Sequence, residues 1–193
     1  FYLIQNIKLF IETATLAAPL PMSIIIAMTM GMLLTSPLSS AAIAITIGLS
    51  GIAGGAAVIG TSIQMIGFAI QSRKDNSVGM VLSIGFGTSM LQFKNILKNP
   101  LIWLPTIISS GIVAPILVLV FSTETTPYGA GMGTAGLVGP LQTLFEMNYS
   151  LNAWLSVLGT FLLGGFLVYL FDLLMRKWQY IKDGDLKVSN DIV

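Results

Sequence analysis

The chain has 193 residues, of which 54% are hydrophobic and 9% are charged, and its net charge is +1. Soluble domains carry about 25% charged residues, so this composition excludes a soluble globular protein and predicts an integral membrane protein. A net charge near zero gives no basic field for a nucleic-acid partner, and the absence of Cys and His excludes disulfides and thiolate or imidazole chemistry. We therefore expect no nucleic acid, no catalytic residue, no cofactor and no metal site in this chain.

Residues 1–13 carry apolar side chains at a helical spacing, with Lys8 and Glu12 between them. This segment is either an interfacial helix or the end of an earlier crossing, and Lys8 favours the cytoplasmic side. The chain starts at Phe1 without the features of a signal peptide, which indicates the C-terminal part of a longer polytopic protein.

Residues 13–72 contain no Asp, Glu, Lys or Arg. A charge at the centre of a bilayer costs about 2.5–3.5 kcal/mol, so a long run without charges is typical of chain that lies in lipid. One spanning helix needs about 20 residues, and this run is long enough for two. Because Pro37 interrupts the run, we predict helices over residues 20–36 and 41–70.

The predicted helix over residues 41–70 is rich in glycine and contains Gly51 and Gly55 at the Gly-x-x-x-Gly spacing. Small residues let helices approach closely in a membrane, so we expect this helix to pack inside a bundle. Alternatively, its central polar residues, among them Gln64, line a path for a substrate.

Residues 78–93 are apolar but number only sixteen, and Lys74 and Lys94 flank them. Basic residues favour the cytoplasmic side, so both flanks are expected there. The segment therefore predicts a re-entrant hairpin that turns near residues 85–88, with a short true crossing as the alternative.

The second half of the chain predicts two further crossings with a glycine-rich element between them. Residues 101–121 and 151–175 are the crossings. Residues 122–152 contain acidic but no basic residues, as suits the outside, and their part 128–140 has too much glycine for a stable helix. We interpret this part as a second re-entrant hairpin, which enters from the opposite face.

The complete prediction is an all-α polytopic membrane protein with about four transmembrane helices and two re-entrant glycine-rich hairpins. It forms a single membrane domain over residues 1–193, with a short cytoplasmic tail at residues 179–193. Asp172 is expected to pair with Arg176, four residues later at a helix end. The basic residues expected on the cytoplasmic side are Lys8, Arg73, Lys98 and Arg176.

Two hairpins that enter from opposite faces bring broken backbone to the middle of the membrane, where transporters build solute sites. The polar side chains near them are neutral, which suits a sugar or polyol whose hydroxyls need both donors and acceptors. The alternative is that each of these side chains only satisfies a helix end. The candidate substrate-binding residues are Thr88, Ser89, Gln92, Gly131, Gly133, Thr134, Gly136, Gln142 and Gln64.

Five ordered motifs resemble the EIIC-type membrane family of the bacterial phosphotransferase system, in the branch that includes the perfringolysin regulator. The resemblance runs from about Thr35 to the end and covers the C-terminal half of the longer family members. The motifs are residues 37–42 (Pro-Leu-Ser-Ser-Ala-Ala), 48–57 (Gly-Leu-Ser-Gly-Ile-Ala-Gly-Gly-Ala-Ala), 87–92 (Gly-Thr-Ser-Met-Leu-Gln), 99–105 (Asn-Pro-Leu-Ile-Trp-Leu-Pro) and 129–139 (Gly-Ala-Gly-Met-Gly-Thr-Ala-Gly-Leu-Val-Gly).

This resemblance implies a homodimeric sugar permease that holds its solute between two re-entrant hairpins, with phosphoryl transfer carried out by separate soluble subunits. Better-known permeases of this superfamily place a His and a Glu near the sugar hydroxyls, and this sequence has no His. Two other functions remain open: a membrane sensor or regulator that keeps the fold without transport, and an ion or small-solute channel.

Overall fold

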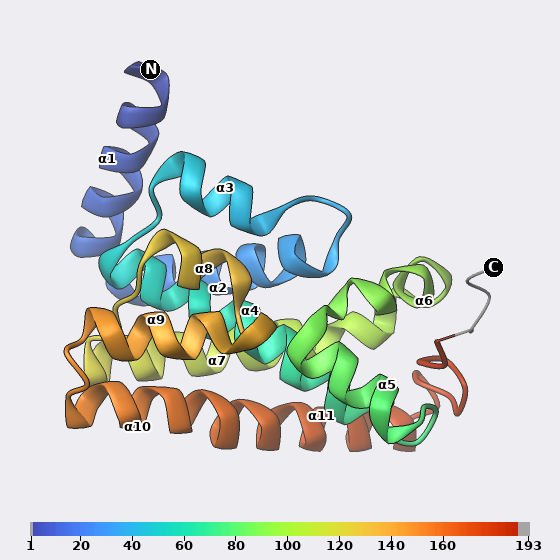
Figure 1. Cartoon of the computed structure of the whole chain (residues 1–193). Helices are drawn as coiled ribbons and strands as arrows, with labels where there is room; N and C mark the ends of the chain where they lie inside the picture. Colours follow the sequence, from blue (N-terminus) through green and yellow to red (C-terminus); the bar gives the residue numbers. More distant parts are fainter. Residues whose placement is uncertain (1, 189–193) are drawn as a thin grey trace.

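Helices form most of residues 2–188, the part of the chain that the computed structural model describes (Figure 1). In chain order they are α1 (Tyr2–Ala17), α2 (Pro19–Thr35), α3 (Ser40–Ile47), α4 (Gly51–Ser72), α5 (Val78–Leu82), η1 (Ser83–Gly87), η2 (Ser89–Gln92), α6 (Phe93–Lys98), η3 (Pro100–Trp103), α7 (Leu104–Phe121), α8 (Pro127–Met132), η4 (Ala135–Leu137), α9 (Val138–Glu146), α10 (Leu151–Gly159), η5 (Thr160–Gly164) and α11 (Gly165–Lys177).

Three of these helical stretches are long and apolar enough to cross a membrane. They are α4, the pair η3–α7 and the continuous helix α10–η5–α11, with 22, 22 and 27 residues. Helix α2 is also apolar but has 17 residues. The protein is therefore an all-α membrane protein, as predicted.

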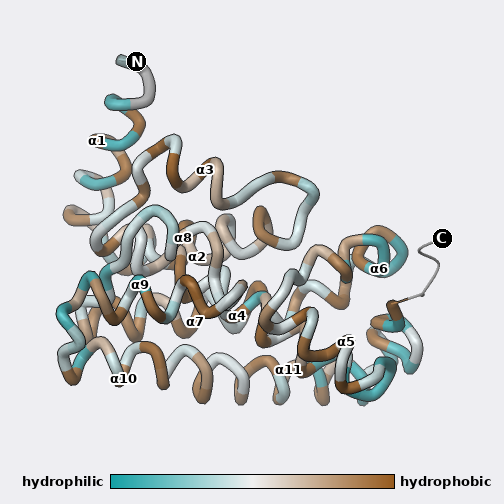
Figure 2. The backbone as a smooth tube through the Cα atoms, viewed as in Figure 1, coloured by the Kyte–Doolittle hydropathy of each residue, from teal (hydrophilic) through white to brown (hydrophobic). Residues whose placement is uncertain are grey.

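Apolar side chains face outward along the sides of this bundle. Figure 2 shows hydrophobic residues along α10 and α11, whose most apolar stretch is only 28% buried, while hydrophilic residues gather toward the two ends of the bundle. A soluble protein would bury such a surface, whereas a lipid-exposed helix keeps it outward.

Helix α4 lies at the centre, and α2 and α7 pack along it. Small residues make this possible: Gly60 faces the backbone of Ala27, and a Cβ on Gly67 would lie 2.5 Å from Cγ2 of Thr106. The close packing predicted for the glycine-rich helix is confirmed. In lipid, such contacts supply the van der Waals attraction that holds helices together.

The predicted single helix over residues 41–70 is wrong, because the chain breaks at residues 48–50. Gly48 ends α3 with φ of 64°, and Gly51 begins α4 with φ of 57°. Glycine adopts this left-handed conformation at no steric cost, so two glycines three residues apart can turn the chain sharply. Apolar residues continue through the break, and for this reason hydropathy alone did not reveal it.

The break makes α3 a short return leg and leaves α2 and α4 parallel. Gly31 of α2 lies against Gln64, just as Ala27 lies against Gly60, so the two helices run in the same direction. Both begin at one end of the bundle, which we call the Glu124 end. Helix α4 finishes at the other, which we call the Arg73 end.

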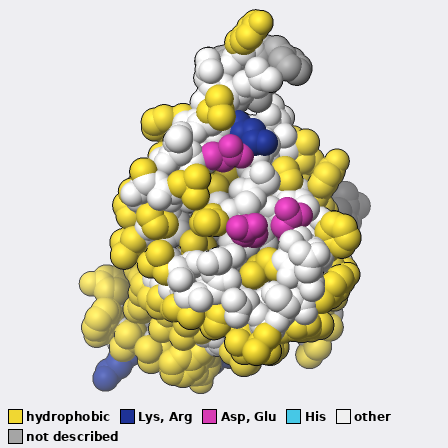
Figure 3. Space-filling view, turned by 90° about the vertical axis from the view of Figure 1, so that its left-hand side faces the viewer, with side chains coloured by type: hydrophobic (Ala, Val, Ile, Leu, Met, Phe, Trp, Pro, Cys, Tyr) yellow, Lys and Arg dark blue, Asp and Glu magenta, His cyan; other side chains and the backbone are white. Residues whose placement is uncertain are grey.

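Lys8 lies at the Glu124 end, and its predicted placement on the same side as Arg73 is therefore wrong. Its Nζ is 3.6 Å from Oε1 of Glu12, and Glu12 shares a surface hollow with Glu124 beside the start of α4. Figure 3 views this end and shows acidic side chains close to a basic one.

The two glycine-rich segments both fold back on themselves. The first glycine loop (residues 78–98) contains α5, η1, η2 and α6, and the second glycine loop (residues 127–146) contains α8, η4 and α9. Before the first loop, Asp75 accepts a bond from the backbone of Leu186, and near its end Asn95 donates to the carbonyl of Lys187. The first loop therefore returns to the Arg73 end, where it started.

The second loop returns to the Glu124 end in the same way. The backbone nitrogen of Glu124, just before the loop, lies 3.5 Å from Sδ of Met147, just after it.

Part of the predicted polar tail is folded across the Arg73 end. This C-terminal strap (residues 181–188) buries Ile181 and Leu186 among apolar residues of α4, η1, α6 and η3. Side chains of Asp75, Asn76, Gln92 and Asn95 bond to its backbone. The end of the predicted tail, residues 189–193, lies outside the described residues.

Candidate functional site

The two glycine loops meet beside α4. Oγ1 of Thr134, near the tip of the second loop, donates a 2.6 Å hydrogen bond to the carbonyl of Gly85 in the first loop. Both residues are buried. Gly85 belongs to η1, a π-helical turn of a kind often found at functional sites.

The second loop is seated on α3 and α4 through its backbone. An added Cβ on Gly133 would lie 2.8 Å from the carbonyl carbon of Thr61, and one on Gly131 would lie 2.5 Å from Cα of Ala41. Ser40 also donates to the carbonyl of Gly131 at 2.7 Å. No side chain fits at either glycine, so the sequence must keep glycine there for the tip to reach the centre of α4.

The tip of the second loop is irregular backbone. Gly133 and Gly136 both have φ of 54°, and Leu137, which follows, has φ of 60°. The left-handed region costs a residue such as Leu on the order of 1 kcal/mol, so the contacts around the tip must hold it in place.

Gln64 is the most informative polar residue of this region. Its side chain is fully buried against Gly31 of α2, one turn along α4 from Thr61. Neither Nε2 nor Oε1 has a hydrogen-bond partner within residues 2–188. A buried polar group without a partner costs about 1–3 kcal/mol, so an amide with two such atoms is a candidate position for a polar ligand.

Most other predicted site residues bond within the protein. Ser89 Oγ lies 3.0 Å from Thr35 Oγ1, and Gln92 donates to the carbonyl of Leu186 in the strap at 2.9 Å. Gln142 accepts a 2.8 Å bond from Thr126, while Thr88 is exposed and accepts from the backbone nitrogen of Met90. The structure thus brings Gly85 and Thr134 together next to α4, and it directs Gln92 to the strap.

Three polar residues that sequence reasoning missed lie on α4 and on the neighbouring η3–α7 helix. Gln71, Ser109 and the indole nitrogen of Trp103 are buried without a partner in the part of the chain that the structure describes. Since α4 and α7 run antiparallel and meet at Gly67 and Thr106, Ser109 lies level with Gln64 and Trp103 with Gln71. The signal was present in the sequence, because residues 64 and 71 are seven apart and share one helix face.

Charged side chains gather at the Arg73 end. Asp172 is fully buried, and both of its carboxylate oxygens lie 3.1 Å from Nε of Arg176 and share its one hydrogen, which confirms the predicted pair. Arg73 lies 3.7 Å from the same carboxylate and 4.7 Å from the ring centre of Tyr169. Two guanidinium groups around one buried carboxylate tie α4 to α11 at this end.

These features define a class: an integral membrane protein whose central helix is contacted by two inward-folded glycine loops and carries unpartnered amides. The family described as "Phosphotransferase system, EIIC" matches residues 2–188, and the chain belongs to this family. No curated protein and no solved structure matches the chain.

Proposed function

We propose that this protein is the membrane permease component of a phosphotransferase system and that it binds and moves a neutral sugar or polyol. The observation that carries the proposal is the Gln64 amide, buried at the centre of the bundle with a free donor and a free acceptor. A sugar hydroxyl both donates and accepts, so one hydroxyl pair can satisfy both atoms of an amide. Ser109 lies level with Gln64 and offers a further hydroxyl.

The two glycine loops are re-entrant elements in this proposal. The Arg73 end faces the cytoplasm in this proposal, because basic residues next to membrane segments favour the cytoplasmic side. The basic residues at this end are Arg73, Lys94, Lys98 and Arg176. The first loop then dips in from the cytoplasm and the second from outside, and the C-terminus is cytoplasmic. Transporters place solutes between such broken segments near the midplane.

The Thr134–Gly85 bond is the contact that must open to admit a solute between the loops. Breaking one buried hydrogen bond costs about 1 kcal/mol net when the freed groups find new partners. A sugar that supplies hydroxyls to Thr134 and to the carbonyl of Gly85 would compensate for the loss. The candidate ligands are therefore Gln64, Ser89, Thr134 and the loop backbone at Gly131, Gly133 and Gly136.

Phosphoryl transfer belongs to separate soluble subunits in this scheme, because the chain has neither His nor Cys to carry a phosphoryl group. A homodimer is the expected assembly.

A second candidate function is a membrane regulator that keeps the EIIC fold without transport. The observation that favours it is that Ser89, Gln92 and Thr134 are already bonded to protein groups.

Sugar binding to the purified protein in nanodiscs separates these two functions. We expect one member of a panel of neutral sugars and polyols to bind saturably. Gln64→Leu should weaken the affinity for that sugar about tenfold, because the loss of about one hydrogen bond costs roughly 1.4 kcal/mol, which is a factor of ten in Kd. Gln5→Leu, at an exposed position of α1, is the matched control and should leave binding unchanged. Absence of binding and of flux in proteoliposomes, with a soluble partner that co-purifies, would instead support the regulator.

A further inference from the structure

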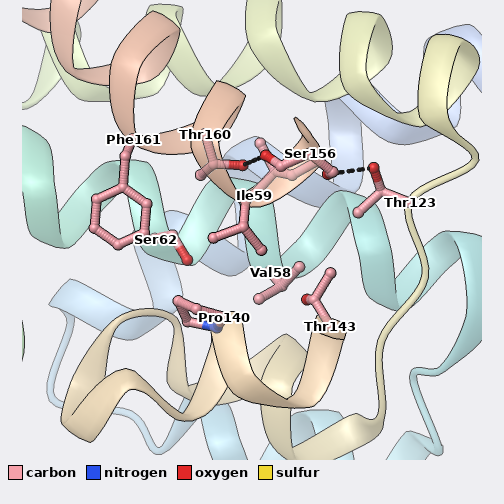
Figure 4. Close-up of a pocket in the computed structure, with 10 residues that line it drawn as sticks. Val58, Ile59, Ser62, Thr123, Pro140, Thr143, Ser156, Thr160 and Phe161 are labelled. Atoms are coloured by element: carbon pink, nitrogen blue, oxygen red, sulfur yellow. Dashed lines mark hydrogen bonds between the residues drawn. The ribbon is translucent and has the colours of Figure 1, made fainter. Parts of the chain in front are cut away.

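A second polar site lies on the far side of the second glycine loop. It is a small cavity between α4, α9 and the α10–η5 stretch, with residue 123 of the α7–α8 connection at its edge (Figure 4). Its apolar lining includes Val58 and Pro140. Hydroxyl groups from four separate parts of the fold line the remainder, and they belong to Ser62, Thr123, Thr143, Ser156 and Thr160.

Four of these five residues are at least 98% buried, and Thr160 is 6% exposed. Thr123 Oγ1 and Ser156 Oγ lie 2.6 Å apart, and Thr160 donates to the carbonyl of Ser156 at 2.9 Å. Thr143 differs from Thr123, Ser156 and Thr160, because its Oγ1 has no hydrogen-bond partner in the described chain. In Figure 4 Thr143 stands across the cavity from Ser156 and Thr160. A buried hydroxyl normally has a partner, so this one indicates an occupant.

The size and the charge of the cavity select that occupant. The space left between the side chains holds about one molecule of the size of water, which is too little for a sugar. All ten lining residues are uncharged, so a cation would keep its full charge in a low-dielectric interior, at a high cost. Water carries no charge and can donate and accept at once, and a buried water typically makes about three hydrogen bonds.

We propose that this hydroxyl cavity is a binding site for a single structural water. The water bonds to Thr143 of α9 and to the hydroxyl groups of the α10–η5 side, and so joins the second glycine loop to the last membrane span.

The site has a mechanical consequence for the loop. Thr160 begins η5, a π-helical turn in which backbone hydrogen bonds join residues five apart instead of four. A water bridge between α9 and this turn can exchange partners as the two elements shift, whereas a direct side-chain bond would hold one spacing. The second glycine loop is therefore held against α10 by a contact that tolerates small movements.

The sign of one stability change tests the proposal. Thr143→Val keeps the shape of the side chain and removes its hydroxyl. If water fills the cavity, the variant loses a bond and leaves the water short of a partner, so we expect Tm to fall by about 3 °C. If the cavity is dry, the same change removes an unsatisfied hydroxyl, and an unchanged or raised Tm would overturn the proposal.

Two controls keep this result interpretable. Thr143→Ser retains the hydroxyl and should keep most of the stability. Thr29→Val on α2 removes a hydroxyl that bonds within its own helix at 2.7 Å, so it should change Tm less than Thr143→Val.

A high-resolution map of the unaltered protein decides the matter even where a variant fails to fold. We expect a single peak about 2.8 Å from Oγ1 of Thr143. An empty cavity would contradict the proposal. So would a Tm that falls when choline replaces sodium at equal ionic strength, provided that Thr143→Val abolishes the difference, because a bound cation would then be the occupant.

Discussion

Gly60 of α4 packs directly against the backbone of Ala27 in α2. A side chain there would overlap the backbone of Ala27, which cannot move without shifting the whole of α2. We expect Gly60→Ala to lower the stability by about 1–3 kcal/mol, as overpacking in a well-packed core does. Thermal unfolding in detergent measures the change.

Gly79→Ala is the matched control for this substitution, because an added Cβ at Gly79 meets nothing within 4 Å. Equal effects of the two substitutions would show that helix contact is not what requires glycine at position 60.

Thr134 connects the two glycine loops through one hydroxyl. Thr134→Val removes the donor and leaves the buried carbonyl of Gly85 without this bond, so we expect the stability to fall by about 1–2 kcal/mol. Thr134→Ser keeps the donor and should lose much less. If both variants unfold at the same temperature, the hydrogen bond contributes nothing and the contact is one of shape alone.

Single residues were predicted unevenly from the sequence. Gly133 and Thr134 lie where the loops meet. The sequence could indicate them because a glycine-rich run predicts an irregular backbone in any fold. Gln92 was assigned to the solute, whereas its amide bonds to Leu186 of the strap. Nothing in the local sequence around residue 92 announces a partner ninety-four positions away.

At the scale of elements, the C-terminal strap stabilises the first glycine loop. It covers Phe68 and Ile84, and Leu186 of the strap donates to Asp75, just before the loop, and accepts from Gln92 within the loop. Removal of residues 181–193 should therefore raise the rate at which trypsin cleaves after Lys94 and Lys98 in α6 at least several-fold. Limited proteolysis in nanodiscs provides the measurement.

Removal of residues 189–193 alone is the control for this truncation, and it should leave the cleavage rate unchanged. A long truncation that cuts no faster than the short one would mean that the strap does not support the loop.

The long spans could be predicted well because each depends on composition over many residues. The spans over 101–121 and 151–175 were found nearly to the residue. The α3–α4 break was missed because a left-handed pair of glycines looks the same in sequence as glycines that serve packing. Gly55 and Gly60 do pack against backbone, whereas Gly48 turns the chain.

At the scale of the whole molecule, the parallel arrangement of α2 and α4 places Lys8 opposite Arg73. The positive-inside rule therefore cannot hold for Lys8 and Arg73 together, and Lys8 is the basic residue whose charge is paired with Glu12 and stands alone in its segment. The chain has no native Cys, so single cysteines can report its topology.

We expect cysteines at Gln5 and Asn148 to react with an impermeant thiol reagent from one side of the membrane, and cysteines at Lys74 and Lys98 from the other. All four positions are exposed. Labelling of Gln5 together with Lys74 would refute the parallel arrangement. Labelling of Lys74 and Lys98 from different sides would refute the first loop as a re-entrant element.

The first loop contributes a main-chain oxygen to the contact between the loops, and every amino acid has that atom. Exchange of the residue at position 85 therefore leaves the acceptor in place, provided that the new side chain fits beside Ala69. The donor, in contrast, exists only while a hydroxyl stands at position 134. Substitutions can therefore remove the contact between the loops through the side chain at position 134 of the second loop. They cannot remove it through the acceptor atom of the first loop.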